Sequence, residues 1–267
     1  TDISATELAK GEQLIYTIYL YTKNRITNVS LLSDQSFSGF FQEWKPISNQ
    51  IEGTRKEYDG KIYQVFEIRK VALFPTKTGE LTIPQLKFAI NVYDPFSFSF
   101  SNSRKIFRTT KELKIRSRQI PGAEGLPVGS YRMELSVPKR EVDINDILTV
   151  KLQISGVGNI KTLPVPEFEP NPYFKVFEPI IKRSSRFTDQ GISGTINSEM
   201  TLNFKKKGVV SLPSLKIKLY DPLKGRVVDL KTKPVHVTVS GIKEKSDTAV
   251  VAIQKEIVKT KLDISYI

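Results

Sequence analysis

A short stretch that occurs twice constrains the fold of this chain more than any other feature. It lies at residues 77–88 and again at residues 206–217. In the first copy Gly79 stands five residues before Pro84, the second copy repeats this spacing, and each copy is followed by a Tyr-Asp-Pro turn. Because ordinary domains contain roughly 100 to 200 residues, a chain of 267 residues with such a repeat is predicted to contain two domains of one kind.

The proline of the repeat separates two apolar alternations that are out of phase. Leu81 and Ile83 precede Pro84 in one phase, and Leu86 and Phe88 follow it in the other. Side chains alternate between the two faces of a strand, so a phase change moves the apolar set to the other face unless the chain bends. We therefore expect a kink, or a strand that changes sheet, at this proline and at its counterpart.

Period-2 patterns of β-branched and aromatic residues predict strands throughout the chain. Clear examples lie at residues 14–21, 63–74 and 145–155, and Asp59-Gly60 is a hairpin-type turn. Many short strands with frequent turns and almost no helical periodicity predict an all-β chain with two tandem immunoglobulin-like antiparallel β-sandwich domains.

The predicted domain boundaries follow from the turn residues. The first sandwich covers residues 1–117, a linker rich in proline and glycine covers residues 118–130, and the second sandwich covers residues 131–240. For residues 241–267 we expect a C-terminal extension, and the alternatives for it are a short helix that leads to a membrane anchor and an ordered extension without a helix.

The composition excludes several kinds of catalytic and metal-binding site. The chain has no cysteine, which excludes disulfides, thiolate metal sites and a cysteine nucleophile, and His236 is its only histidine. The pattern around His236 places it on the solvent face of a strand. The carboxylate pairs Asp143/Asp146 and Glu167/Glu169 could suggest a glycosidase or a calcium site, but at turns such residues are usually only solvated. We predict no catalytic, cofactor-binding or metal-binding residues, and no cofactor.

The net charge of +13 is spread over both predicted domains. A dedicated DNA-binding protein would more often concentrate its charge on one helix or arm, so we expect no nucleic-acid partner. A diffuse positive charge is compatible with anionic lipid or an acidic partner. The run at residues 205–207 is predicted to be a charged strand edge that discourages sheet pairing.

Two aromatic stretches are the candidate partner-binding sites. The first lies in a predicted loop at residues 37–44 and includes Phe40, Phe41 and Trp44. The sequence favours packing of these rings into the core, and a protein-binding surface and base stacking are the alternatives. The second stretch is a predicted hairpin in which phenylalanine alternates with serine, and its candidate residues are Phe96, Phe98 and Phe100.

Residues 16–22, 37–44, 69–83 and 154–161 resemble the BatD proteins, a bacterial oxygen-tolerance or aerotolerance family. The most specific elements are Ser-Gly-Val-Gly-Asn and Leu-Phe-Pro-Thr-Lys-Thr-Gly. The resemblance implies a periplasmic protein anchored in the inner membrane, of which this chain would be the middle and last sandwiches, without signal peptide and membrane helix. It implies no catalytic residues.

The same resemblance implies partners. These are membrane proteins with von Willebrand A-type domains (BatA- or BatB-like) and, indirectly, a MoxR-type ATPase. We therefore expect a non-enzymatic protein-interaction scaffold in oxygen or envelope stress tolerance. The alternative is a surface carbohydrate-binding or adhesin module, which tandem sandwiches with aromatic loops also fit.

Overall fold

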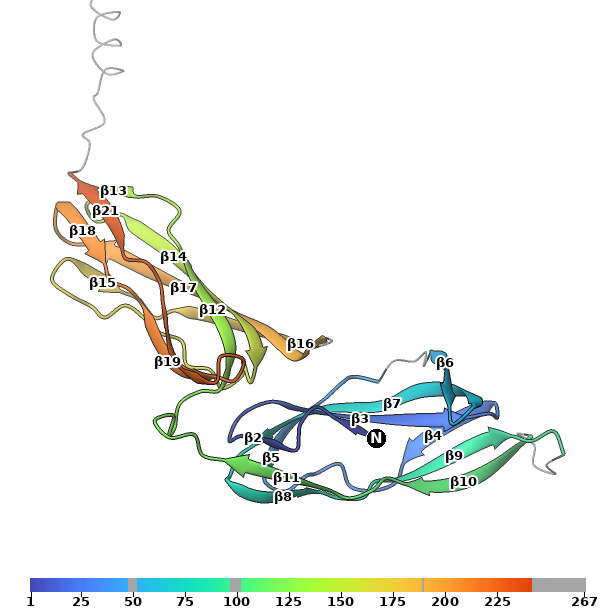
Figure 1. Ribbon diagram of the computed structural model, residues 1–267. Coiled ribbons are helices and arrows are strands. Elements are labelled where there is room, and N and C mark those ends of the chain that lie inside the picture. The colour runs from blue at the N-terminus through green and yellow to red at the C-terminus, as the bar shows by residue number, and fades with distance from the viewer. Residues whose placement is uncertain (48–51, 97–101, 189, 242–267) are drawn as a thin grey trace, which may run out of the picture.

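The protein is all-β and consists of two immunoglobulin-like sandwiches joined end to end at an angle (Figure 1). The computed structural model describes residues 1–47, 52–96, 102–188 and 190–241, and in these ranges it contains strands and no helix. The helix expected after Gly241 lies outside the described residues. The fold class predicted from the sequence is confirmed.

The first sandwich packs one large sheet against two smaller ones. The large sheet has the order β1-β3-β7-β5, with β6 also paired to β7, and the smaller sheets are β10-β9-β4 and β2-β11-β8. Leucine, isoleucine and valine from all three sheets meet in one core. The strands are β1 (Asp2–Ile3), β2 (Glu7–Ala9), β3 (Leu14–Thr22), β4 (Ile26–Leu31), β5 (Phe40–Trp44), β6 (Gly53–Tyr58), β7 (Lys61–Pro75), β8 (Gly79–Ile83), β9 (Lys87–Tyr93), β10 (Ser103–Thr109) and β11 (Leu113–Arg118).

The second sandwich repeats this plan. Its large sheet is β12-β14-β17-β15 with β16 also on β17, and its smaller sheets are β13-β21-β18 and β19-β20. One apolar core again fills the space between them. The strands are β12 (Gly129–Ser136), β13 (Glu141–Asp143), β14 (Ile147–Gly158), β15 (Phe174–Val176), β16 (Ile180–Thr188), β17 (Gly191–Phe204), β18 (Gly208–Leu212), β19 (Lys216–Asp221), β20 (Arg226–Lys231) and β21 (Val235–Ser240).

The repeated stretch is the place where the chain changes sheet. β8 pairs with β11, whereas β9, which follows Pro84, pairs with β10 and β4. In the second copy β18 pairs with β21, and β19, after Pro213, pairs with β20. The apolar residues on both sides of each proline are buried in the same core. The change in phase of the apolar alternation at the proline therefore lets the two strands face this core from different sheets.

The glycine five residues before each proline has a left-handed backbone conformation. The φ angle is 105° at Gly79 and 117° at Gly208, and no atom lies within 4 Å of an added Cβ at either position. The cost of replacing Gly79 therefore comes from backbone strain, which is roughly 1–2 kcal/mol for a non-glycine residue.

We predict that Gly79→Val lowers the free energy of unfolding by at least about 2 kcal/mol, because a β-branched side chain is strained at this φ. Pro84→Ala should cost less, about 0.5–1 kcal/mol, because proline mainly restricts the unfolded chain. Urea denaturation of both variants checks the order. Equal and negligible effects would contradict the assigned role of the glycine.

One local expectation differs from the structure. The loop predicted around Phe40 is strand β5, which pairs with the end of β7. Residues 191–194 form the beginning of β17, where Gly191 has a φ of 101° and Gly194 pairs with both β14 and β16. The last strands lie in two sheets, since β19 pairs with β20 and β21 pairs with β18. In contrast, His236 is exposed on β21 as predicted.

Candidate interaction surfaces

Strand β5 sends two of its three candidate aromatic residues inward. Phe40 and Trp44 pack against the core of the first sandwich, and the Trp44 ring lies 5.8 Å from the ring of buried Phe37. The alternation of side chains along a strand explains why these two residues share a face. Both rings therefore contribute to the core, and the proposed role of Phe40 and Trp44 in partner binding stays a prediction.

The remaining candidates lie on the surface or outside the described residues. Phe41 points to the outer face of β5, with 38% of its surface exposed, and its ring lies 5.9 Å from that of Phe74. Phe96 is 89% exposed in the turn after β9. Phe98 and Phe100 lie outside the described residues. Among the candidate aromatics in the described residues, Phe41 and Phe96 are thus the ones that a partner could reach directly.

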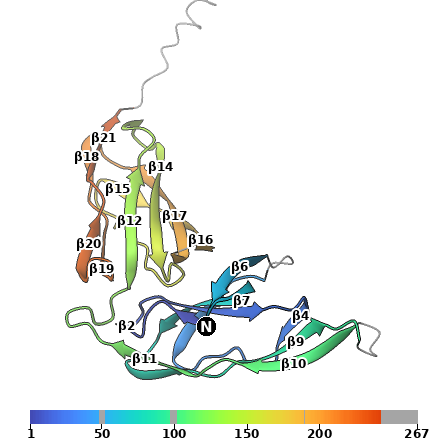
Figure 2. The same cartoon turned by 45° about the vertical axis from the view of Figure 1, so that its right-hand side comes forward.

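Two polar side chains of the first sandwich bind the second sandwich. Gln13 accepts a hydrogen bond from the Ile192 N–H (2.7 Å) and donates one to the Gln190 carbonyl (3.0 Å). Glu43 accepts a hydrogen bond from the Ser185 hydroxyl (3.2 Å) and forms an ion pair with Lys161 (2.9 Å). These contacts join the ends of the two large sheets, where β16 approaches the first sandwich (Figure 2).

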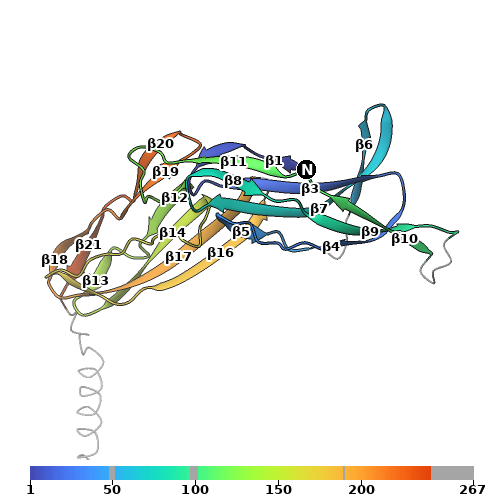
Figure 3. The same cartoon turned by 90° about the horizontal axis from the view of Figure 1, so that it is seen from below.

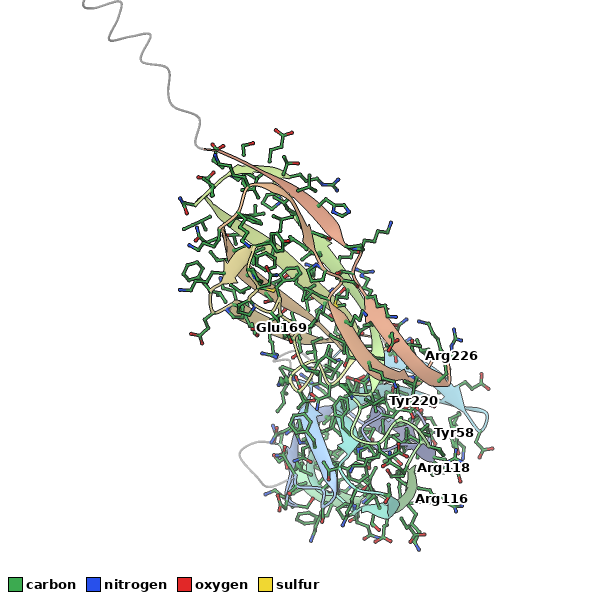
Figure 4. The ribbon with its side chains drawn as sticks, turned by 90° about the vertical axis from the view of Figure 1, so that its left-hand side faces the viewer. Tyr58, Arg116, Arg118, Glu169, Tyr220 and Arg226 are labelled. Carbon is green, nitrogen blue, oxygen red and sulfur yellow. The ribbon has the colours of Figure 1, made fainter. Side chains whose placement is uncertain are left out.

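Apolar contacts strengthen the junction at two places. On the outer face of β7, Ala72 and Phe74 are buried together with Ile192, and Ile15 and Phe187 pack against them. The segment between β11 and β12 forms a second small cluster, in which Ala9, Ala123 and Tyr220 are buried. Figure 4 shows Tyr220 at the boundary of the two sandwiches. The connecting segment is therefore packed against both domains.

The two Tyr-Asp-Pro turns have the same local geometry and different surroundings. Asp94 Oδ1 accepts the Phe96 N–H at 3.1 Å, and Asp221 Oδ1 accepts the Leu223 N–H at 3.1 Å. Only Asp221 is buried, and it also accepts a hydrogen bond from Ser130 and pairs with Lys224 at 3.1 Å. Burial alone would raise the pKa of Asp221, but these hydrogen bonds and the charge of Lys224 lower it below its ordinary value.

A lowered folded-state pKa makes Asp221 stabilising above its unfolded-state pKa, and this contribution is lost as the pH falls through the folded-state value. We predict that Asp221→Asn melts several degrees below the wild type at pH 6. The difference should shrink as the pH falls from about 4 towards 2. Thermal denaturation at each pH measures this. A difference that stays constant down to pH 2 would contradict a role of the charge.

Three tyrosines form an exposed cluster that sequence analysis missed. The Tyr21 ring lies 6.0 Å from Tyr58 and 6.4 Å from Tyr63, and 44% of Tyr21 and 67% of Tyr58 are exposed. Lys23 lies over the Tyr63 ring at 5.3 Å. The cluster belongs to the sheet face where β6 and the start of β7 form an arm that stands away from the sandwich (Figure 3). Exposed tyrosines are common in protein interfaces.

The Ser-Gly-Val-Gly-Asn element has a structural role. Gly156 pairs with Tyr131 across β12 and β14, and an added Cβ would lie 2.1 Å from the Ser130 carbonyl oxygen. At Gly158, with a φ of 135°, a Cβ would lie 2.5 Å from the Tyr131 hydroxyl. That hydroxyl is buried without a hydrogen-bond partner among the described residues, and burial raises its pKa. The two glycines leave the space that Tyr131 occupies.

A cleft lies between the two sandwiches. The cleft has a volume of about 630 Å³, and its charged lining residues are Asp2, Glu12 and Lys70. Across the described ranges, no group of three or more histidines or carboxylates could hold a metal ion. In the same ranges the structure has no helix with the length and hydrophobicity of a membrane span.

Comparison with known proteins gives one informative match. Residues 135–239 match a family model described as the BatD DUF11-like domain. No curated protein matches the chain. Among solved structures, the adhesin InvE of Yersinia pseudotuberculosis is similar at 10% identity with a TM-score of 0.24, over 89% of this chain and 57% of the adhesin. The chain thus spans less than two thirds of that adhesin, and so weak a likeness carries no argument about function.

Proposed function

We propose, from the match of residues 135–239 to the BatD DUF11-like family model, that the protein is a non-enzymatic interaction scaffold of the bacterial envelope in oxygen or stress tolerance. It works in the periplasm, held at the inner membrane. Its partners are membrane proteins with von Willebrand A-type domains and, through them, a MoxR-type ATPase. The family match over residues 135–239 is the observation that carries this proposal.

The domain junction supports a scaffold role. Gln13, Glu43 and the apolar cluster around Phe74 fix the second sandwich on the first. A scaffold needs its binding surfaces at constant positions, and a junction with both polar and buried apolar contacts provides this. The exposed tyrosine cluster lies on the first sandwich, so the two domains together present more surface than the family-matched domain alone.

The location can be tested with a single thiol, because the chain contains no cysteine. His236 is exposed on β21, so His236→Cys in the full-length protein provides an accessible label. We expect a membrane-impermeant maleimide to label this variant in intact spheroplasts, with unmodified protein as the blank. Labelling only after the inner membrane is lysed would place the domain in the cytoplasm and contradict the proposal.

A further inference from the structure

We propose that the far end of the second sandwich binds the surface of an anionic phospholipid bilayer. The contact is made by the outer face of its large sheet, where β15 and the end of β17 carry exposed apolar side chains next to lysines. We call this surface the distal face, and its residues are Ile147, Tyr173, Lys175, Phe177, Ile180, Lys205 and Lys206. The proposal goes beyond the scaffold function above, because its partner is a lipid surface and its test involves no partner protein.

The distal face lies at the end of the second sandwich that points away from the first. β17 begins at Gly191, next to Ile192, which is buried against the first sandwich, and it ends at Phe204. Its 14 residues span roughly 45 Å. β15 pairs with the last residues of β17, so both lie far from the domain junction (Figure 1). The contacts between the sandwiches therefore leave the distal face uncovered.

The register of β15 places an aromatic ring and two lysines on the outer side of the sheet. Phe174 pairs with Phe204, and both are buried in the core. Because side chains alternate along a strand, Tyr173 and Lys175 point outward. The Lys205 N–H donates to the Tyr173 carbonyl at 2.8 Å, so Lys205 continues the same face at the end of β17.

Three apolar side chains extend the distal face along β17. They lie beside every second residue of that strand, with Ile147 beside Asn203, Phe177 beside Thr201 and Ile180 beside Glu199. The intervening residues of β17 are buried in the core, so these three side chains point away from it. Ile147 and Ile180 are each 60% exposed, Phe177 is 41% exposed and Tyr173 is 50% exposed. A group of exposed apolar side chains on one face marks an interaction surface.

The lysines of the distal face contact its rings and bind no carboxylate of the described residues. The Lys175 Nζ lies over the Phe177 ring at 5.0 Å, and the Lys206 Nζ lies over the Tyr173 ring at 5.3 Å. Lys175, Lys205 and Lys206 form no ion pair with another described residue. Their charge is therefore available to an anionic partner.

Three carboxylates lie near the distal face, and two of them are already paired. Glu199 forms an ion pair with Lys151 at 3.1 Å, and Asp146 forms one with Lys139 at 3.5 Å. Glu178 is exposed next to Phe177. The unpaired lysines thus outnumber the unpaired carboxylate, and the face is positive.

The composition of the distal face favours a lipid surface over a protein partner. Protein interfaces are depleted in lysine and enriched in arginine, whereas this face has lysines and no arginine. At a bilayer surface, apolar side chains enter the boundary between head groups and acyl chains, and the long lysine side chains reach the phosphates. Each lysine near an anionic bilayer strengthens binding about fivefold.

The first test measures binding of the 267-residue chain to vesicles by co-sedimentation. We expect binding to vesicles of phosphatidylcholine with phosphatidylglycerol, and none to phosphatidylcholine alone. The combined variant Lys175→Glu, Lys205→Glu and Lys206→Glu should weaken binding by about tenfold or more. All three lysines are exposed, so the variant should fold like the wild type. Absence of binding to the anionic vesicles, or equal binding to both kinds, would overturn the proposal.

A second charge-reversal variant is the matched control for the overall charge of +13. Lys216, Lys218 and Lys233 are exposed on the opposite side of the same sandwich, in or next to β19 and β20, and form no ion pair with another described residue. Replacing all three by glutamate changes the net charge equally and should weaken binding by about twofold or less. An equal loss in both variants would assign binding to the charge of the whole chain and contradict a role of the distal face.

A single tryptophan reports whether the apolar side chains enter the lipid. Trp44 is the only tryptophan of the chain and packs against the core of the first sandwich, so the wild type is the blank. In Phe177→Trp, we expect brominated phospholipid in anionic vesicles to quench the emission clearly more than in the wild type. Binding without this additional quenching would overturn the proposed contact. These outcomes are independent of the location test above and of any protein partner.

Discussion

Replacing Gly156 by alanine is expected to lower the free energy of unfolding of the second sandwich by about 3 kcal/mol. The added Cβ would lie 2.1 Å from the Ser130 carbonyl oxygen and 2.7 Å from the Tyr131 Cα. These are backbone atoms of the paired strand β12, which cannot move aside without breaking the ladder between β12 and β14. Urea denaturation monitored by circular dichroism measures the loss.

Gly225→Ala is the matched control for Gly156→Ala. Gly225 lies in the same domain with a φ of 64°, and no atom lies within 4 Å of an added Cβ. Backbone strain alone should cost about 1 kcal/mol there. If Gly156→Ala costs no more than this control, steric contact with β12 is not the reason for the glycine in the Ser-Gly-Val-Gly-Asn element.

Phe74→Ala is expected to cost about 3 kcal/mol and to loosen the two sandwiches from one another. Phe74 is 3% exposed on the outer face of β7, where Ile192 of the second sandwich covers it. Removal of a buried phenylalanine typically costs 3–5 kcal/mol. Because the lost contacts lie between the domains, we also expect the single unfolding transition to separate into two. Denaturation and small-angle X-ray scattering together measure both effects.

Phe41→Ala is the control for this change. The Phe41 ring lies beside that of Phe74 but is 38% exposed, so its removal should cost less than about 1 kcal/mol and leave the scattering profile unchanged. A Phe74→Ala variant with wild-type scattering and one cooperative transition would show that the hydrogen bonds of Gln13 and Glu43 hold the junction without the apolar cluster.

The sequence predicted the features that depend on local periodicity. The change in the phase of the apolar residues at Pro84 indicated a change of sheet. Inward-facing residues alternate along each strand, so two successive strands that face the same core from different sheets have alternations out of phase. The position of His236 on a solvent face followed from the valines on both sides of it. These properties are set by a few neighbouring residues.

The candidate surfaces depend on contacts between distant residues, and local patterns do not reveal them. Whether an aromatic residue of β5 faces the core or the solvent depends on its pairing with β7. The tyrosine cluster combines residues of three strands, which are distant in the sequence. The alternation in residues 14–21, which places Tyr19 and Tyr21 on the same face, was the sequence signal that Tyr21 could be exposed.

The most direct test of the scaffold function is recovery of partners from the full-length protein in its native membrane. The tagged protein would be cross-linked in intact cells, solubilised and purified, with a tagged unrelated membrane protein as control. The proposal predicts enrichment of membrane proteins with von Willebrand A-type domains. Repeated recovery of the protein without such partners, from preparations in which both are present, would contradict it.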